Sequence, residues 1–417
     1  MVQDTGKNIL SNNISNKKIE CLVMGILVST LCVPVEIRVG VLGKKIGLIN
    51  YLAIICISLL ICINYKNVNK KYSIYIYIMV MYYLVTLFLK NEEMFTIIKV
   101  IMVYILPLLM IGINIEKNLF IRLLKKIINL FNFLIILITI LGLLEFILKI
   151  PISILLSNFM TPRMQELIQI QQEREVFRLY SFMGHPLFNT QLYLMFFVLN
   201  NIYTKYFGKI LNQKIVIIIS IIGIGMTASK TGLILILLSI ILVTHNKSYL
   251  KKFIFIFCIL IIIVSTGIFD NTLQRFAEGS LTSGRSESWN YIIKNGIFPI
   301  KFFSGYGHEF TFKLNNYFEW ASAAYEYPFR MFALEFGRLM SILIYIPIGL
   351  IPTFILLKRK QIYLFISYII IFIDINTYNG LAVAGDHMLL IAIFIFIILN
   401  ISKILESKES IIINNKV

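Results

Sequence analysis

Charged side chains are scarce in this chain. Asp, Glu, Lys and Arg together make up 14% of its 417 residues, whereas hydrophobic residues make up 58%. Soluble domains usually carry about 25% charged residues, so this composition excludes an ordinary water-soluble fold. Cysteine is also rare, and all five cysteines lie inside apolar runs, where a thiol behaves as a small hydrophobic group. Neither a disulfide framework nor a zinc site is therefore expected.

Most of the chain consists of long runs of apolar residues. A spanning helix needs about 20 mostly apolar residues, and such runs recur along the whole chain, which predicts one all-α polytopic membrane domain over residues 1–417. We expect about twelve transmembrane helices. Their predicted ranges are 20–36, 46–63, 72–89, 95–114, 127–148, 187–203, 214–227, 231–244, 252–269, 338–357, 361–379 and 386–402.

The seventh and eighth ranges are short and could form a single helix, which would invert everything downstream. Three lysines precede the pair and three follow it, and basic clusters are expected on the same side of a membrane, so two crossings with a hinge at 228–231 are predicted. With the N-terminus in the cytoplasm, the inner segments hold 22 of the 39 basic residues but only five of the 21 acidic ones. This pattern predicts cytoplasmic N- and C-termini, and it explains the net charge of +18 without a nucleic-acid partner.

Two outer segments are longer than simple connections. The first, 149–186, contains an amphipathic stretch that we expect to lie along the membrane interface. The second, 270–337, between the ninth and tenth predicted helices, is the longest polar segment and the expected catalytic loop, because long structured loops are usually functional.

The outer half also collects basic residues that the positive-inside rule disfavours there. Guanidinium groups bind phosphate oxygens in pairs, so an anionic ligand at the outer leaflet would explain them. Pairing with nearby glutamates or lipid headgroups would explain them equally well. For Lys230, which is set between two helices where ionisable groups are costly, a functional role is favoured.

Four short motifs follow one another in this part of the chain. Ser283-Gly284-Arg285 precedes a predicted helix that contains Trp289 and stops at Gly296, and a helix start of this kind attracts anions. The other three motifs are Gly184-His185-Pro186, Ser229-Lys230 and Gly305-Tyr306-Gly307.

In the order of these motifs and in the number of helices, from about 178 to 350, the chain resembles the O-antigen ligase and Wzy-type O-antigen polymerase family, and Ser283, Gly284, Arg285 and Trp289 also match the family's spacing. The family has a Ser-Arg pair where this chain has Ser229-Lys230, and its asparagine after the His-Pro pair corresponds to Asn189. Ligases of the family usually carry a histidine nine residues before the glutamate of an E-x-G element. Here Glu326 stands nine residues before Glu335, which favours a polymerase.

The resemblance implies a metal-independent glycosyltransferase in the bacterial inner membrane, with its active site on the extracytoplasmic face. It would transfer glycan from undecaprenyl pyrophosphate to the acceptor sugar of another lipid-linked repeat unit of an O-antigen or capsule. Many lipid-linked glycosyltransferases hold a metal with an acidic pair in the first outer loop, but residues 37–45 contain no acid, so no metal or other cofactor is expected. The lipid bilayer and the lipid-linked oligosaccharide are the expected partners, and a chain-length regulator remains open.

The resemblance also suggests roles for individual residues. Arg285, Glu326, Glu335 and His185 are the catalytic candidates, with Glu326 the first choice of base and Glu335 the second. The candidates for pyrophosphate binding are Arg178, Lys230, Arg275, Arg285, Arg330 and Arg338. Trp289 and His308 are the candidates for sugar binding.

Two other functions remain as alternatives. An O-antigen ligase would use the same donor with a different acceptor. A lipid-linked oligosaccharide flippase would be a transporter without chemistry of its own, and should show two related halves around a central cationic cavity. The charges here gather in one asymmetric outer loop, which favours the polymerase.

Overall fold

The computed structural model describes residues 2–148, 159–160, 165–166, 168–169, 177–244, 267–277, 285–317 and 327–414. Within these ranges the regular structure is helical, apart from one antiparallel bridge between Val68 and Ile113. Among the described residues, six helices are long and apolar enough to cross a membrane, or seven if one bent helix pair is counted as a span. The predicted class, an all-α membrane protein, is therefore confirmed.

The number of crossings stays a prediction, because helix length and hydropathy within the described ranges support fewer than twelve. The predicted range 252–269 falls almost entirely outside the described residues. Three apolar helices are shorter than a usual span: α11 (Gln213–Thr227), α12 (Lys230–Val243) and α20 (Ile362–Ile375). The hinge predicted at 228–231 is confirmed, since α11 and α12 are separate neighbouring helices that meet there.

The N-terminal helices are α1 (Val2–Leu31), α2 (Val35–Leu42), α3 (Lys44–Gly47), α4 (Tyr51–Ile63), α5 (Lys70–Phe88), α6 (Met94–Val100) and α7 (Lys117–Leu148). After α6 the helix continues through η2 (Ile101–Ile105) and η3 (Leu106–Gly112). The first predicted helix, 20–36, is wrong at its end, because the chain breaks after Leu31 and turns by 75° into α2. Pro34 explains the break, since proline has no N–H to continue the helical ladder.

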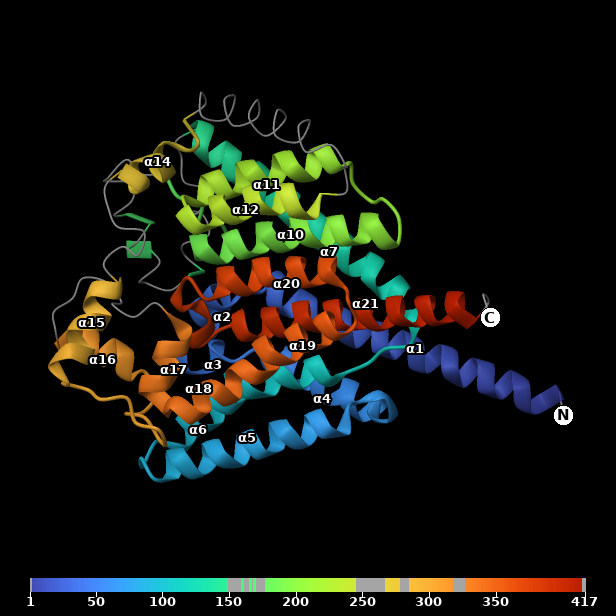
Figure 1. Cartoon of the computed structure of the whole chain (residues 1–417), viewed down its shortest axis with the longest axis horizontal. Helices are drawn as coiled ribbons and strands as arrows, with labels where there is room; N and C mark the ends of the chain where they lie inside the picture. The colour runs from blue at the N-terminus through green and yellow to red at the C-terminus, as the bar shows by residue number, and fades with distance from the viewer. Residues whose placement is uncertain are drawn as a thin grey trace.

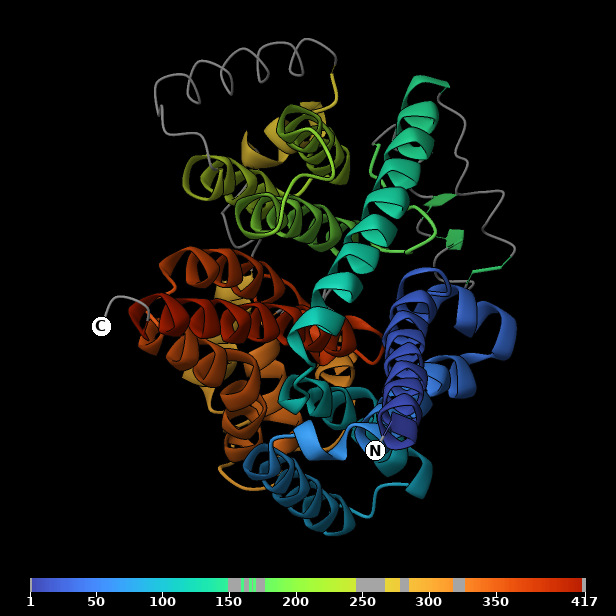
Figure 2. The same ribbon diagram turned by 90° about the vertical axis from the view of Figure 1, so that its right-hand side faces the viewer.

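The C-terminal helices surround a buried centre. They are α10 (Pro186–Tyr206), α18 (Arg338–Tyr345), η4 (Ile346–Leu350), α19 (Ile351–Lys358), η5 (Asn379–Ala382) and α21 (His387–Asn414). Most of α10 is buried although it carries several amides, and these bond internally: Asn200 Nδ2 donates to Asn132 Oδ1 at 2.7 Å. Figure 2 shows α10–α12 in green, α18–α21 in orange to red and α1–α5 in blue, with α7 in teal running between the green and the blue helices.

The predicted catalytic loop contains four short helices, α14 (Asp270–Ala277), α15 (Arg285–Asn295), α16 (Phe310–Tyr317) and α17 (Pro328–Phe336). All four lie at one end of the helix bundle, and both termini lie at the other (Figure 1). The predicted interfacial segment 149–186 lies largely outside the described residues. The fold therefore separates the 270–337 elements from the termini by the length of the bundle.

Candidate functional site

Three of the predicted pyrophosphate ligands converge on the α11–α12 hinge. Arg178 Nε donates to the carbonyl oxygen of Thr227 at 3.3 Å, and Arg275 Nη1 donates to the carbonyl oxygen of Ala228. Lys230 begins α12, with its Nζ 5.5 Å from the centre of the Phe276 ring. These three cations come from segments far apart in the sequence, and together we call them the basic turn.

The backbone of the hinge explains why the cations meet there. Ala228 adopts a left-handed conformation with φ 52°, which ends α11. Ser229 Oγ then accepts a hydrogen bond from Gly232 N at 3.0 Å and caps α12, so the positive end of the α12 dipole lies at the same turn. Burial raises the pKa of Tyr180, while the charges of Arg178 and Arg275 act against this rise. The turn is thus electropositive.

His185 lies at the start of α10, as predicted, and acts as its N-cap. Its Nδ1 accepts a hydrogen bond from Leu187 N at 3.2 Å, and its ring stacks on Tyr378 with 6.1 Å between centroids. The Tyr378 hydroxyl donates to Gln191 Oε1 at 2.8 Å and lies 3.1 Å from His387 Nδ1. We call His185, Gln191, Tyr378 and His387 the His185 group.

A second polar group gathers around His308, which was predicted only as a sugar ligand. Its Nε2 lies 3.5 Å from Glu309 Oε1, and its Nδ1 lies 3.7 Å from Glu335 Oε2. Lys99 Nζ lies 3.3 Å from Glu309 Oε1, and Thr311 Oγ1 donates to Glu335 Oε1 at 2.5 Å. We call these five residues the His308 cluster. Sequence reasoning missed Lys99, Glu309 and Thr311, because nothing in the local sequence ties α6 to this loop.

The Gly305-Tyr306-Gly307 motif positions the His308 cluster. Tyr306 N donates to the Leu334 carbonyl oxygen at 2.8 Å, and Gly307 N donates to the Glu335 carbonyl oxygen at 3.0 Å. A Cβ on Gly305 would lie 2.2 Å from the Leu334 carbonyl oxygen, so only glycine allows this approach. The glycines therefore bring the loop onto the end of α17 and set His308 opposite Glu335.

The charges of the His308 cluster are mutually dependent. Burial opposes protonation of His308, but Glu309 and Glu335 outweigh it, so the pKa of His308 is raised. The adjacent His308 lowers the pKa of Glu309 to about 2, with burial acting against it and Lys99 adding to the effect. The cluster can thus hold or exchange a proton between an imidazole and two carboxylates, which is the equipment of general acid–base chemistry.

A series of contacts, some polar and some aromatic, leads from the His308 cluster to the His185 group and on to the basic turn. Tyr104 packs edge-on against His308, and its hydroxyl donates to the carbonyl oxygen of Ala382 at 2.9 Å, in the turn that begins at Tyr378. Next to Gln191 on α10, Thr190 Oγ1 donates to Thr227 Oγ1 at 2.8 Å, and Thr227 also accepts from Arg178. These contacts connect the three groups at the same end of the bundle, and together we call them the polar region.

The remaining predicted site residues lie elsewhere or outside the description. Arg330 lies 4.7 Å from the ring centres of both Trp289 and Tyr327, and Trp289 is only 7% exposed, so these residues contact one another directly. Arg338 is exposed at the start of α18. Arg285 begins α15 as predicted, but its side chain lies outside the described residues, and so does all of Glu326.

In the described part of the chain, no three His, Cys, Asp or Glu side chains are arranged to hold a metal ion. The four described cysteines, Cys21, Cys32, Cys56 and Cys62, are free thiols. No family model matches the chain, and no curated protein or solved structure is significantly similar to it.

Proposed function

We propose that this protein is a polysaccharide polymerase that transfers glycan from an undecaprenyl-pyrophosphate carrier to the acceptor sugar of another lipid-linked repeat unit. The observation that carries the proposal is the basic turn, where Arg178, Lys230 and Arg275 come together from three segments. Paired guanidinium groups and an ammonium group match the charge of a pyrophosphate. The short sequence motifs support the same donor.

In the proposed reaction, the bond between the anomeric carbon of the glycan and the pyrophosphate oxygen breaks, and a new glycosidic bond forms to the acceptor hydroxyl. Negative charge develops on the departing undecaprenyl pyrophosphate, where the basic turn would stabilise it. The acceptor hydroxyl loses its proton to a base. The polar region would bind the two reacting groups next to each other, which itself lowers the barrier.

Glu335 is the base that the geometry favours. It is buried, and its carboxylate lies between the Thr311 hydroxyl and the His308 ring, so its orientation is restrained. His308, close to both Glu335 and Glu309, would favour the ionised, proton-accepting form of Glu335 through its own positive charge. Glu326, the first choice from the sequence, remains a candidate that lies outside the described residues.

The proposal includes a topology. The polar region and the 270–337 elements would lie outside the bacterial inner membrane, and both termini would lie in the cytoplasm, with about twelve crossings between them. Two findings support this arrangement. The loop helices and the termini occupy opposite ends of the bundle (Figure 1), and the basic residues concentrate in the segments assigned to the inside.

Glycan ladders from a complemented deletion strain test the proposal. Lys230→Gln, Arg275→Gln, Arg285→Ala and Glu335→Gln should each abolish long-chain glycan while the protein still inserts. Lys294→Gln is the matched control, because Lys294 is an exposed cation on α15 in the same loop. Normal ladders from the Lys230 and Arg275 variants would overturn the proposal.

The glycan intermediates that accumulate in the deletion strain distinguish the three alternatives. A polymerase defect leaves single repeat units transferred to the lipid anchor. A ligase defect leaves long polymer that never reaches the anchor. A flippase defect leaves single lipid-linked units on the cytoplasmic side of the membrane.

A further inference from the structure

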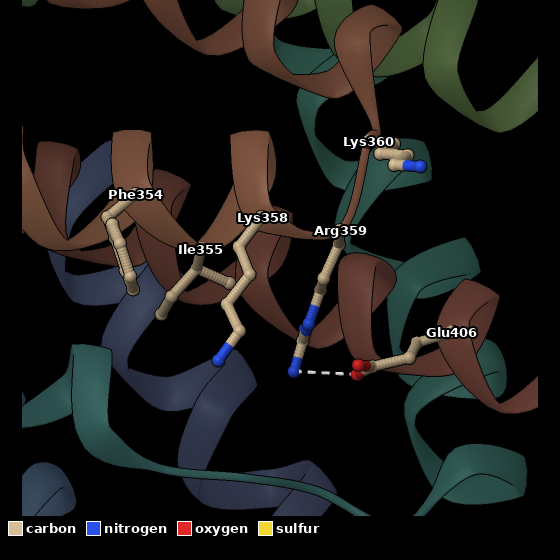
Figure 3. Close-up of a pocket in the computed structure, with 6 residues that line it drawn as sticks. All are labelled: Phe354, Ile355, Lys358, Arg359, Lys360 and Glu406. Carbon is tan, nitrogen blue, oxygen red and sulfur yellow. Dashed lines mark ion pairs between the residues drawn. The ribbon is translucent and has the colours of Figure 1, made fainter.

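A cavity opens at the other end of the bundle, far from the polar region. It has a volume of about 590 Å³ and is lined by Phe354, Ile355, Lys358, Arg359, Lys360 and Glu406. Figure 3 shows Lys358 and Arg359 extending to the same side of the α19 ribbon, with Arg359 reaching Glu406. We call this cavity the basic cleft. Its three cations and one carboxylate leave it with an excess of positive charge.

The cations of the basic cleft differ in how they are bound. Arg359 Nη2 pairs with Glu406 Oε2 at 2.8 Å, and its Nη1 donates to Ser402 Oγ at 2.9 Å, so Arg359 is held against α21. Lys358 and Lys360 are exposed, and among the described residues no carboxylate lies within 4.0 Å of either ammonium group. These two lysines supply the charge that an anion would meet.

An apolar stripe leads up to the lysines along α19. Leu350, Phe354 and Leu357 are 64%, 66% and 44% exposed, and their spacing of four and three residues sets them on one side of the helix. Lys358 follows Phe354 by one turn, with its Nζ 6.0 Å from the Phe354 ring centre. Such a surface is complementary to an anionic phospholipid, because the apolar side chains can contact an acyl chain and the lysines can bind the headgroup phosphate.

We propose that the basic cleft binds an anionic phospholipid, with the headgroup phosphate at the Lys358 ammonium group, the charge of Lys360 adding to the attraction from the helix end, and an acyl chain along Leu350, Phe354 and Leu357. The stripe favours a lipid over a free phosphate, because a soluble anion would gain nothing from exposed leucine and phenylalanine side chains. Bound lipid would brace the α19–α20 turn against α21. The proposal stands independently of the glycan chemistry at the other end.

Lipid binding by the purified full-length protein in detergent tests the proposal. Phosphatidylglycerol should bind more tightly than phosphatidylcholine, as measured by lipid retention in native mass spectrometry. The double variant Lys358→Gln, Lys360→Gln should lower the affinity for phosphatidylglycerol roughly tenfold or more, because each lysine near a lipid surface contributes about a severalfold factor. The matched control is Lys294→Gln, Lys313→Gln, which removes two exposed lysines on the short loop helices α15 and α16.

Equal losses in both double variants would overturn the proposal, because they would show attraction to any basic patch. The variant Glu406→Gln should change the affinity for phosphatidylglycerol in the opposite direction. Removing this carboxylate frees Arg359 and should strengthen phosphatidylglycerol binding, whereas weaker binding would contradict an anion in the cleft. Glycerol phosphate without acyl chains should not compete at equal concentration, and full competition would assign the cleft to a soluble phosphate instead.

Discussion

At the scale of single residues, the His308 cluster is the part of the molecule with the clearest chemical potential. His308 is buried, and neither of its ring nitrogens forms a hydrogen bond of good geometry, although carboxylate oxygens lie 3.5 and 3.7 Å away. A buried imidazole in that position is stabilised in its protonated form by the two carboxylates. A protonated His308 would keep Glu335 ionised and could itself donate a proton, which a packing residue could not do.

The charge on His308 should make stability depend on pH. Its folded pKa is raised above 6.5, so its contribution is fully present below pH 6.5 and is lost as the pH rises through the raised value. Glu309, with a folded pKa of about 2, contributes above pH 4.5 and loses that contribution as the pH falls towards 2. The pair should therefore stabilise the protein most between about pH 4.5 and 6.5.

Melting temperatures of the wild type and His308→Gln in detergent, measured from pH 5 to 9, check this prediction. The wild type should melt higher near pH 5.5, and the difference should shrink as the pH rises. Glu287→Gln, on the exposed side of α15, serves as the control and should show no such trend. A constant difference across the range would contradict a charged His308.

At the scale of elements, the His308 cluster depends on the close contact between the glycine-containing loop at 305–307 and the end of α17. Gly305 contacts the Leu334 and Glu335 backbone so closely that any Cβ must displace the loop from α17. Gly296, after α15, has φ +59° but open space around its Cα. Gly305 is therefore required because a side chain would not fit, whereas Gly296 is favoured only because its backbone conformation is left-handed.

Gly305→Ala should lower stability by about 1–3 kcal/mol, because it forces a methyl group into packed backbone. Gly296→Ala should lower the free energy of unfolding by about 1 kcal/mol, because alanine is strained in a left-handed conformation. Gly305→Ala should also abolish glycan polymerisation, whereas Gly296→Ala should leave it largely intact. Melting temperature and glycan ladders measure the two effects, and an active Gly305→Ala protein would show that the loop does not need this contact.

Local sequence signals predicted several of these elements well. The α11–α12 hinge, the start of α10 at Pro186 and the end of α15 before Gly296 all follow from glycine, proline and charge patterns that act within a few residues. The break after Leu31 was missed, although Pro34 was visible, because the apolar run continues through it.

Long-range pairs could not be predicted in this way. Arg38 and Asp386 form a buried ion pair with two contacts of 2.9 Å, and they are 348 residues apart. Lys99 reaches Glu309 across a separation of 210 residues. The three cations of the basic turn were among six predicted pyrophosphate ligands, because each lay where the positive-inside rule disfavours basic residues, but which of the six meet depended on the fold.

At the scale of the whole molecule, the two ends of the bundle have opposite characters. One end carries the polar region and the loop helices, and the other carries the termini and the basic cleft (Figure 1). A protein that draws substrate and acceptor from one leaflet needs this asymmetry. The orientation of the bundle in the membrane is then the property on which the proposed function depends.

Topology reporters test that orientation. A periplasm-active reporter inserted near Gly279 should give a signal, and one fused after the C-terminal residue should not. A cytoplasm-active reporter should give the reverse pattern. A cytoplasmic signal at 279 would place the basic turn on the wrong face for a lipid-linked donor.

The central claim is that this chain itself joins glycan units carried on a polyprenyl pyrophosphate. Purified protein in liposomes, supplied with undecaprenyl-pyrophosphate-linked repeat units, tests it most directly by mass analysis of the products. The account predicts lipid-linked chains of two or more repeats together with released undecaprenyl pyrophosphate, and neither product from the Lys230→Gln, Arg275→Gln protein. Unchanged single-repeat lipid after incubation with correctly folded wild-type protein would contradict it.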